Sequence, residues 1–353
     1  MSSAAITLPL ATAMHEADAA QNSSKARIKI GQIGTTHAHA SGKLQTIRKF
    51  DQVYELVGVV EPDAKRRASL ENSATYRGVK WLTEEDLLRV SGLQVVAVET
   101  EVRDLVSTAQ RCVSAGLHIH LDKPAGENLS DFKKLLDAAE QQKLVVQMGY
   151  MFRYNKAFQL LFQAVRDGWL GEIFEVHAVI SKTVGADARK RLAEYPGGAM
   201  FELGCHLIDA IVAVMGKPEK VTPFLRRTRP DLDDLADNQL AVFDYPKATA
   251  TVRSALMEVD GFRRRQLVVC GDKGTIVIRP LEPPRMELTL SEANGDYRKG
   301  TQVVDLPKSG GRYDGDFVDL AKIIRGEKAS DYPPAHDLAV QEAVLQASGL
   351  RTE

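Results

Sequence analysis

The feature that most constrains the fold is a regular alternation of short apolar runs and amphipathic stretches in the first half of the chain. The runs at Tyr54 to Glu61 and Leu93 to Val98 are almost continuously apolar, which predicts strands buried on both faces. Similar runs occupy residues 28–33, 117–121 and 144–148, with helical patterns between them. Strands of this kind form parallel sheets covered by helices. The sequence therefore predicts an α/β fold with a doubly wound Rossmann sheet over residues 27–149.

The pattern changes after residue 149. Glu172 to Lys182 alternates strictly between apolar and polar residues, as expected for a half-exposed strand of an antiparallel sheet. Further strands are predicted at residues 239–245, 249–255, 266–270, 275–278 and 286–290. Residues 150–353 are thus expected to form an α+β domain with a large, mostly antiparallel, open sheet. Its closing helices, at about 315–325 and 338–348, can pack back on the first domain.

Composition excludes several classes of partner. Basic and acidic residues number 46 and 47, for a net charge of −1, and no basic stretch is interleaved with aromatic residues. Neither nucleic acid nor an anionic membrane is an expected partner. No apolar run reaches the roughly 18 residues of a membrane span.

The cysteines and the N-terminus indicate where the chain resides. Cys112, Cys205 and Cys270 are odd in number and widely spaced, which argues against disulfides and favours a reducing compartment. Residues 1–26 have no basic residue before Lys25, so we interpret them as a mobile tail rather than a secretory signal. The expected location is the cytoplasm.

One polar stripe stands out in an apolar helical segment. Glu202, His206 and Asp209 lie at i, i+4 and i+7, so on a regular α-helix they share one face. A lone buried histidine is usually part of a satisfied hydrogen-bond network. Two flanking carboxylates favour another interpretation, because such groups orient an imidazole and tune it as a proton acceptor.

The first turn of the predicted Rossmann sheet keeps a single glycine of the usual glycine-rich fingerprint. Gly34 allows the bend, and Thr35, Thr36 and the amides that follow can approach a pyrophosphate at the helix N-terminus. Glu61 ends the next strand, where a carboxylate grips a ribose diol and repels a 2′-phosphate. The expected cofactor is therefore NAD, with NADP less favoured. The run at residues 65–67, Lys-Arg-Arg, is a counter-signal, although solvated charges at a helix start are the favoured explanation of it.

Two histidine pairs, His37/His39 and His118/His120, have a spacing that metal sites also use. We expect no metal, because His37 and His39 lie in a turn and no cysteine or carboxylate completes a plausible ligand set. A structural role or, for His37, a contact with the cofactor is the expected function.

Four motifs in order resemble the Gfo/Idh/MocA family of nicotinamide-dependent sugar and cyclitol oxidoreductases. They are Leu-Asp-Lys-Pro-Ala at 121–125, Gly-Tyr-Met-Phe-Arg-Tyr at 149–154, the segment 197–209 with the polar stripe, and the segment 313–326. The resemblance extends from Arg27 to Gly349 and implies the two-domain fold.

The resemblance also implies roles for particular residues. Lys123 would hydrogen-bond the reacting hydroxyl, and Asp122 would contact the nicotinamide ribose. Arg153 and Tyr154 belong to the stretch where substrate and cofactor meet, and Thr100 would line the nicotinamide pocket. The catalytic residues implied are Lys123, Glu202, His206 and Asp209, with the last three also binding substrate. The chain departs from the family pattern at Glu202 and Asp122, whose acidic side chains differ from the usual ones by one methylene, and at Glu101.

The expected reaction is hydride transfer between nicotinamide and a secondary hydroxyl of a sugar, glycoside or cyclitol, with C3 of a pyranoside as a candidate. His206 would act as base, Lys123 would polarise the oxygen and Asp209 would orient His206. One alternative is a redox-neutral enzyme that retains NAD through oxidation, elimination or hydrolysis, and reduction. Another is a non-enzymatic sensor of sugars or dinucleotides. The open sheet predicts a homodimer or homotetramer.

Overall fold

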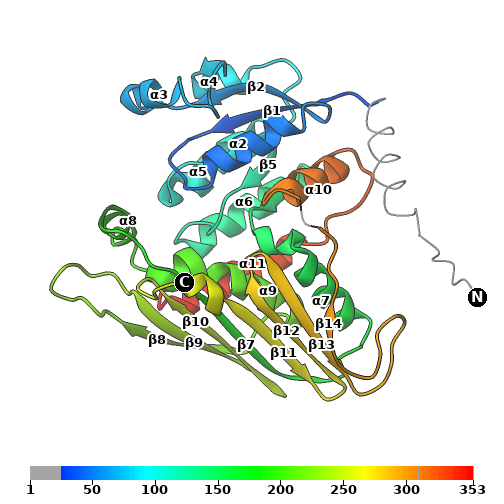
Figure 1. Cartoon of the computed structure of the whole chain (residues 1–353). Coiled ribbons are helices and arrows are strands. Elements are labelled where there is room, and N and C mark those ends of the chain that lie inside the picture. The colour runs from blue at the N-terminus through cyan, green and yellow to red at the C-terminus, as the bar shows by residue number, and fades with distance from the viewer. Residues whose placement is uncertain (1–24, 309, 353) are drawn as a thin grey trace, which may run out of the picture.

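The computed structural model describes residues 25–308 and 310–352, so nearly all of the expected N-terminal tail lies outside the described residues. Figure 1 shows a small sheet with its helices at the top and a broad sheet at the bottom, with further helices between the two. The predicted α/β fold with these two sheets is confirmed.

The first sheet is entirely parallel and has the strand order β3-β2-β1-β4-β5-β6. Its strands are β1 (Ile28–Ile33), β2 (Tyr54–Val60), β3 (Trp81–Leu82), β4 (Val95–Val98), β5 (His118–Leu121) and β6 (Val146–Met148). The helices between them are α2 (Ala40–Lys49), α3 (Ala64–Leu70), α4 (Glu84–Leu88), α5 (Val102–Ser114) and α6 (Leu129–Gln141). The reversal of strand order between β1 and β4 is the point where doubly wound sheets bind ligands.

Both faces of this sheet are buried, as its apolar strands require. Val96 and Val98 pack with α5 and α6 on one face. Val95 and Ala97 pack on the other face with α2 and with α10 (Asp314–Ile324), which arrives from the end of the chain. The hydroxyl of Tyr54 also donates to the carbonyl of Phe317 in α10 at 2.6 Å.

The second sheet has eight strands in the order β14-β13-β12-β11-β7-β10-β9-β8. Only the central pair β7/β10 is parallel. The strands are β7 (Ile173–Ser181), β8 (Lys220–Arg226), β9 (Asn238–Tyr245), β10 (Ala248–Ala255), β11 (Gln266–Gly271), β12 (Gly274–Leu281), β13 (Pro284–Leu290) and β14 (Gly300–Val304). Alternate residues are buried, as in Val176, Ala178 and Ile180 of β7, so one face forms the core.

Helices α7 (Lys156–Arg166), α9 (Cys205–Met215) and α11 (Pro334–Ala347) lie on that core face, between the two sheets in Figure 1. Helix α11 also holds the loop after β5. The side chain of Gln341 accepts a hydrogen bond from the amide of Ala125 at 3.1 Å and donates one to the carbonyl of Gly126 at 2.6 Å. The closing helices therefore fix the segment that carries Lys123 against the second domain.

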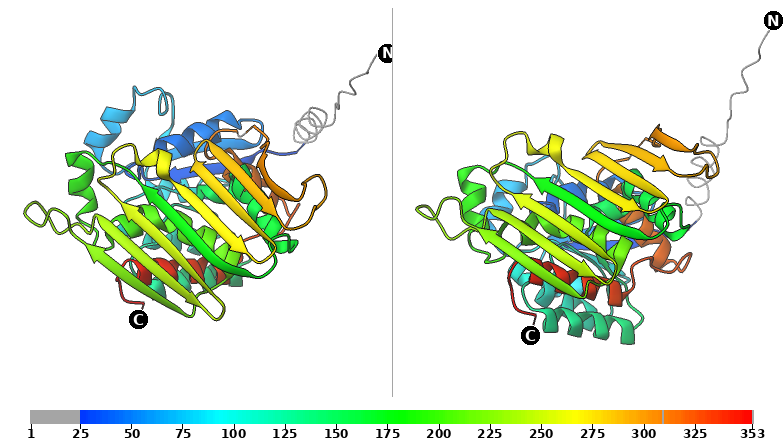
Figure 2. Two further views of the ribbon diagram at one scale, coloured as in Figure 1. Left: turned by 60° about the horizontal axis from the view of Figure 1, so that its bottom comes forward. Right: turned by 90° about the horizontal axis from the view of Figure 1, so that it is seen from below.

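The opposite face of the second sheet has no helix over it within residues 25–308 and 310–352 (Figure 2). A cross-strand row of half-exposed side chains runs over this face, from Val242 through Thr251, His177 and Val268 to Val277.

In the described part of the chain, no helix is long and apolar enough to cross a bilayer.

Candidate active site

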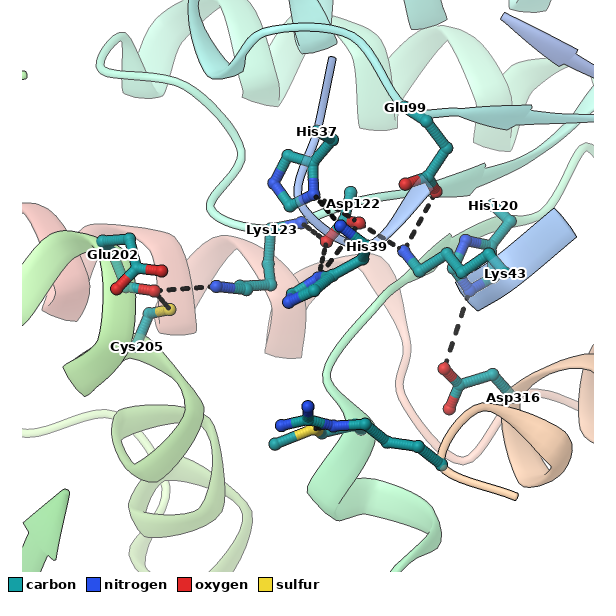
Figure 3. A network of polar contacts seen from close by, with 12 residues as sticks. His37, His39, Lys43, Glu99, His120, Asp122, Lys123, Glu202, Cys205 and Asp316 are labelled. Atoms are coloured by element: carbon teal, nitrogen blue, oxygen red, sulfur yellow. Dashed lines mark hydrogen bonds and ion pairs between the residues drawn. The ribbon is translucent and has the colours of Figure 1, made fainter. Parts of the chain in front are cut away.

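Lys123 stands at the carboxyl end of β5, where parallel sheets place their ligands. Its side chain is 2 % exposed, and its Nζ donates to the main-chain carbonyl of Glu202 at 2.7 Å. That carbonyl belongs to the segment that leads into α9, so the ammonium group crosses from the first domain to the second (Figure 3). Lys123 is thus a buried group at the junction, not a solvated charge at a strand end.

The carboxylate of Asp122 is fully buried beside Lys123 and is the centre of a polar network (Figure 3). It accepts a hydrogen bond from Lys43 Nζ at 2.6 Å and another from the amide of Lys123 at 2.7 Å. Nδ1 of His37 lies 2.9 Å from Oδ2, and Nδ1 of His39 lies 3.2 Å from each oxygen. Burial alone would raise the pKa of Asp122, but His37 and Lys43 outweigh it and hold the pKa well below the usual range.

Lys43 and Glu99 extend this network and were not predicted from the sequence. Both side chains are completely buried, and Lys43 Nζ lies 3.0 Å from Glu99 Oε1. Burial raises the pKa of Glu99 well above its usual value, against the opposing effect of Lys43, and Asp122 adds to the rise. A signal was present, because Lys43 occurs on the apolar face of α2 together with Leu44 and Ile47.

His206 lies in the first turn of α9, with its ring edges against Tyr150 and Phe152 at centroid distances of 6.0 and 5.7 Å. The ring of His39 is 6.4 Å away. Nδ1 of His206 has no hydrogen-bond partner among residues 25–308 and 310–352. Burial, followed by the charge of Lys123, lowers the pKa of His206 well below its ordinary value. The imidazole is therefore neutral and able to accept a proton.

The expected polar stripe is not formed as predicted, because the helix is irregular. Residues Met200–Gly204 form a π-helical turn, in which the amide of Cys205 donates to the carbonyl of Met200, five residues earlier. This wide turn shifts Glu202 relative to His206, whereas His206 and Asp209 both lie in the regular helix α9. Asp209 contacts Arg153, not His206, with an Oδ1 to Nη2 distance of 2.6 Å. The sequence hypothesis that Asp209 orients His206 has no supporting contact.

Arg153 and Asp209 belong to a buried ion cluster with Asp337. Arg153 Nη2 lies 2.5 Å from Asp337 Oδ1, and its guanidinium stacks on Tyr332 at 3.9 Å. The two paired carboxylates differ: burial raises the pKa of Asp337, whereas Arg153 overcomes burial and lowers the pKa of Asp209. All three side chains are 1 % exposed, so this cluster ties three segments of the second domain together and does not line the cavity described below.

Glu202 and Tyr154 occupy different surroundings. The Glu202 carboxylate pairs with Lys182 Nζ at 3.1 Å, and Lys123 and Lys182 outweigh burial to lower the pKa of Glu202. Tyr154, expected to bind substrate, instead donates to Asp319 and accepts from Gln147, both at 2.9 Å. Tyr154 is not among the residues that line the cavity beside Lys123.

A cavity of about 130 Å³ joins the residues of both domains. Thr36, His37, His39 and Lys123 line it from the first domain, and Arg191, Tyr195, Phe201 and Glu202 line it from the second. Two contacts close its edge, from Arg103 to Glu194 at 2.6 Å and from Tyr195 to Glu101 at 2.9 Å. The structure therefore brings Lys123, Glu202 and the first turn together around one space, while His206, Asp209, Arg153 and Tyr154 are not among the residues that line it.

A second cavity, of about 520 Å³, opens beside Gly34, Glu61 and Thr100. Gly34 has φ +89°, and a Cβ there would come within 2.7 Å of the Glu99 carbonyl, so the bend requires glycine. Glu61 accepts the hydroxyl of Thr35, and Arg66 Nε donates to the same hydroxyl at 2.6 Å. Arg67 lines the cavity. The basic run at 65–67 is thus not merely a solvated helix start, because two of its members contact the first turn or the cavity.

The histidine pairs are placed differently from each other. Nδ1 of His118 accepts the amide of Val145 at 3.0 Å, and the buried ring of His120 stacks on Phe317 at a centroid distance of 4.8 Å. His37 and His39 converge on Asp122. The sequence argument that no carboxylate completes a set with them was wrong, because Asp122 is distant in sequence and adjacent in space.

The Arg153 cluster gives a prediction about stability. Arg153→Met should lower the free energy of unfolding by about 3–5 kcal/mol, because it leaves Asp209 and Asp337 buried without a counter-charge. Denaturant titration followed by circular dichroism measures the change. Lys133→Met, which breaks an exposed pair with Asp137, is the control and should cost at most about 0.5 kcal/mol. A loss below about 1 kcal/mol for Arg153→Met would contradict this account.

Both domains of the chain are similar to known proteins. Residues 28–150 match the model of an oxidoreductase family with an NAD-binding Rossmann fold, and residues 158–277 match the model of the GFO/IDH/MocA C-terminal domain. The uncharacterized oxidoreductase YhhX of Escherichia coli is 28% identical over 60% of this chain and 61% of its own length. The rhizopine catabolism protein MocA of Rhizobium meliloti is 25% identical over 53% of this chain and 55% of its own length. The matched regions thus span less than two thirds of these curated relatives.

A solved structure extends the similarity of fold over nearly the whole chain. The UDP-N-acetylglucosamine 3-dehydrogenase of Acidithiobacillus ferrooxidans superposes with a TM-score of 0.76 and 18% identity. The superposition covers 92% of this chain and 97% of that protein. At this identity the likeness concerns the fold alone.

Proposed function

Because the chain belongs to the Gfo/Idh/MocA family of oxidoreductases, we propose that it is an NAD-dependent dehydrogenase acting on a secondary hydroxyl of a sugar, glycoside or cyclitol. The observation that carries this proposal is the position of Lys123. Its buried ammonium group reaches from the cofactor domain to the carbonyl of Glu202, four residues before His206. A cation and a neutral imidazole are the two groups that alcohol oxidation needs at one oxygen.

The residues of the first domain fit a dinucleotide. The bend at Gly34, the cavity beside Glu61 and the carboxylate at the end of β2 suit an adenosine and its ribose diol. Thr35, Thr36 and His37 follow in the turn that precedes α2, and Thr100, Asp122 and Lys123 lead toward the second domain. We propose that these residues hold the cofactor. A bound nicotinamide supplies the hydride acceptor or donor.

The protein side of the reaction is then a proton transfer beside a fixed charge. We propose that His206, held neutral by burial and by Lys123, takes the proton of the substrate hydroxyl. The Lys123 ammonium stabilises the negative charge that develops on that oxygen. Glu202 would accept a neighbouring hydroxyl, with Lys182 fixing its orientation.

The cavity lining supports a polyol substrate. Glu202 and Glu101 supply carboxylates that accept hydroxyl groups, and Arg191 and Lys123 supply cations. The family resemblance implies C3 of a pyranoside as the candidate reacting carbon. Asp209, Arg153 and Tyr154 have no place in this proposal as substrate ligands, because their polar groups are engaged elsewhere.

A panel of sugars, glycosides and inositols, assayed with NAD and NADP, tests the proposal. NADH should form together with a keto product for at least one member. Copurified NAD with product formation but no net NADH would favour the redox-neutral alternative. Ligand binding without any reaction would favour the sensor and reject the dehydrogenase.

The lowered pKa of His206 predicts an unusual acid limb of the pH profile. A base works only when unprotonated, so a lower pKa moves the loss of activity to lower pH. The acid limb of kcat/KM should therefore lie below pH 6.5, the ordinary pKa of histidine. Because Lys123 contributes to the shift, the residual activity of Lys123→Met should show a limb moved upward. An acid limb at or above pH 6.5 in the wild-type enzyme would reject His206 as a neutral base.

Glu61 predicts the preference between the two cofactors. Its carboxylate disfavours a 2′-phosphate, whereas Arg66, 3.6 Å from Glu61, and Arg67 favour one. Glu61→Gln should raise the ratio of kcat/KM for NADP to that for NAD by roughly 10- to 100-fold. The exposed Glu85→Gln is the control and should leave the ratio unchanged. An unchanged ratio in Glu61→Gln would show that Glu61 does not contact the ribose.

We also propose that the open face of the second sheet is covered by another copy of the chain, giving a dimer or tetramer. The half-exposed row from Val242 to Val277 supports this, because large apolar sheet faces are usually covered. Light scattering measures the oligomeric state: the wild type should be a dimer or tetramer, and Val268→Asp should shift it toward the monomer. A monomeric wild type would reject the proposal.

The free thiols Cys112, Cys205 and Cys270 support a cytoplasmic location, which cell fractionation tests.

A further inference from the structure

Two imidazoles and a carboxylate converge at the first turn, next to the proposed reaction site (Figure 3). One atom from each of His37, His39 and Asp122 lies within 4.8 Å of the others. The shortest contacts are 2.9 Å from His37 Nδ1 to Asp122 Oδ2 and 3.2 Å from His39 Nδ1 to the same carboxylate. A tetrahedral ion with bonds of about 2.0–2.1 Å places its ligand atoms about 3.3 Å apart. The two distances from histidine to carboxylate are therefore close to the spacing that one ion would impose.

We propose that His37, His39 and Asp122 form a binding site for one divalent transition-metal ion, such as Zn²⁺. Two imidazole nitrogens and one carboxylate are a ligand set that zinc and ferrous iron both accept. The proposal rests on the ligand geometry, and the site shares His37 and Asp122 with the proposed cofactor site.

The surroundings of Asp122 resemble the outer shell of a metal site. Ligating carboxylates are usually held by further hydrogen bonds, and here Lys43 and the amide of Lys123 supply them at 2.6 and 2.7 Å. Behind Lys43 lies Glu99, a second buried carboxylate. One ammonium thus faces two buried carboxylates.

The site also has an open side. His37, His39 and Lys123 all line the cavity of about 130 Å³, so three protein ligands would leave a coordination position facing it. If the proposed reaction is correct, the ion adds positive charge where the substrate oxygen lies beside Lys123 Nζ. The other cluster of similar composition, Asp209, His336 and Asp337, does not line this cavity and carries no such proposal.

Cobalt binding to the full chain tests the site. Protein without a histidine tag is treated with a chelator, dialysed, and titrated with Co²⁺ while visible absorption is followed. Equilibrium dialysis against Zn²⁺ gives the stoichiometry. We expect visible Co²⁺ bands that saturate at one ion per chain. His37→Gln and His39→Gln should each weaken binding by more than about 100-fold, since loss of an outer-shell partner alone costs 10- to 100-fold.

His177→Gln is the matched control, because His177 lies on the open face of the second sheet, 2.9 Å from the hydroxyl of Thr251. This variant should bind Co²⁺ as the wild type does. The proposal is overturned if the wild type retains no metal, or if His37→Gln and His39→Gln bind it as tightly as the wild type. Thermal melting shows that the variants are folded, and NAD binding is measured separately. Retention of NAD without metal would reject the metal site and leave the dehydrogenase proposal standing.

Discussion

Lys123→Met is expected to lower kcat/KM by about 10³- to 10⁵-fold on the true substrate, the largest effect of any single substitution. The ammonium group is buried and held at 2.7 Å from the carbonyl of Glu202, so it is fixed before substrate arrives. Methionine keeps the length and apolar stem of the side chain but removes the charge that stabilises the developing alkoxide. The change also removes a positive charge that lowers the pKa of His206.

Steady-state kinetics with the best substrate of the panel measure the effect. Lys133→Met is the control, because Lys133 lies exposed on α6 and should leave kcat/KM unchanged. Fluorescence titration with NADH shows whether the variant still binds cofactor. Activity of Lys123→Met within a factor of about 10 of wild type would reject Lys123 as the stabilising cation.

His206→Gln is expected to lower kcat by about 10²- to 10⁴-fold, the usual contribution of a general base. Glutamine retains a polar side chain of similar size but cannot take up a proton at neutral pH. Because His206 packs against Tyr150 and Phe152 and not against the cavity beside Glu61, NAD affinity should change little.

The pH profile separates this role from a structural one. In His206→Gln the acid limb attributed to His206 should disappear, while a merely destabilised protein would keep it. Unchanged kcat in the variant would contradict the assignment.

The sequence predicts the fold because the signals for it are local. Strands such as Tyr54–Val60 and Val95–Val98 are apolar throughout, and the alternating β7 strand shows its two faces directly. The position of Lys123 also follows from the sequence, since a lysine directly after a buried parallel strand must lie at the ligand-binding edge of the sheet. For the same reason Glu61 was placed beside the first turn.

The site geometry is less predictable because it depends on backbone irregularity and on distant pairs. The π-helical turn at Met200–Gly204 has no sequence signature in the i, i+4 rule, and it changes the position of Glu202 relative to His206. The pairing of Arg153 with Asp209 and Asp337 joins residues 56 and 184 positions apart. The convergence of His37, His39 and Asp122 likewise depends on two turns, after β1 and after β5, that are distant in sequence and adjacent in space.

Deuterium transfer tests the central claim most directly. A substrate from the panel is labelled with deuterium at the reacting carbon and incubated with stoichiometric enzyme and NAD, and the cofactor is analysed by mass spectrometry. We predict that wild type moves the label to the nicotinamide and that Lys123→Met and His206→Gln, which still bind NAD, do so far more slowly. Wild-type enzyme that binds both molecules and transfers no label would contradict hydride transfer at this site.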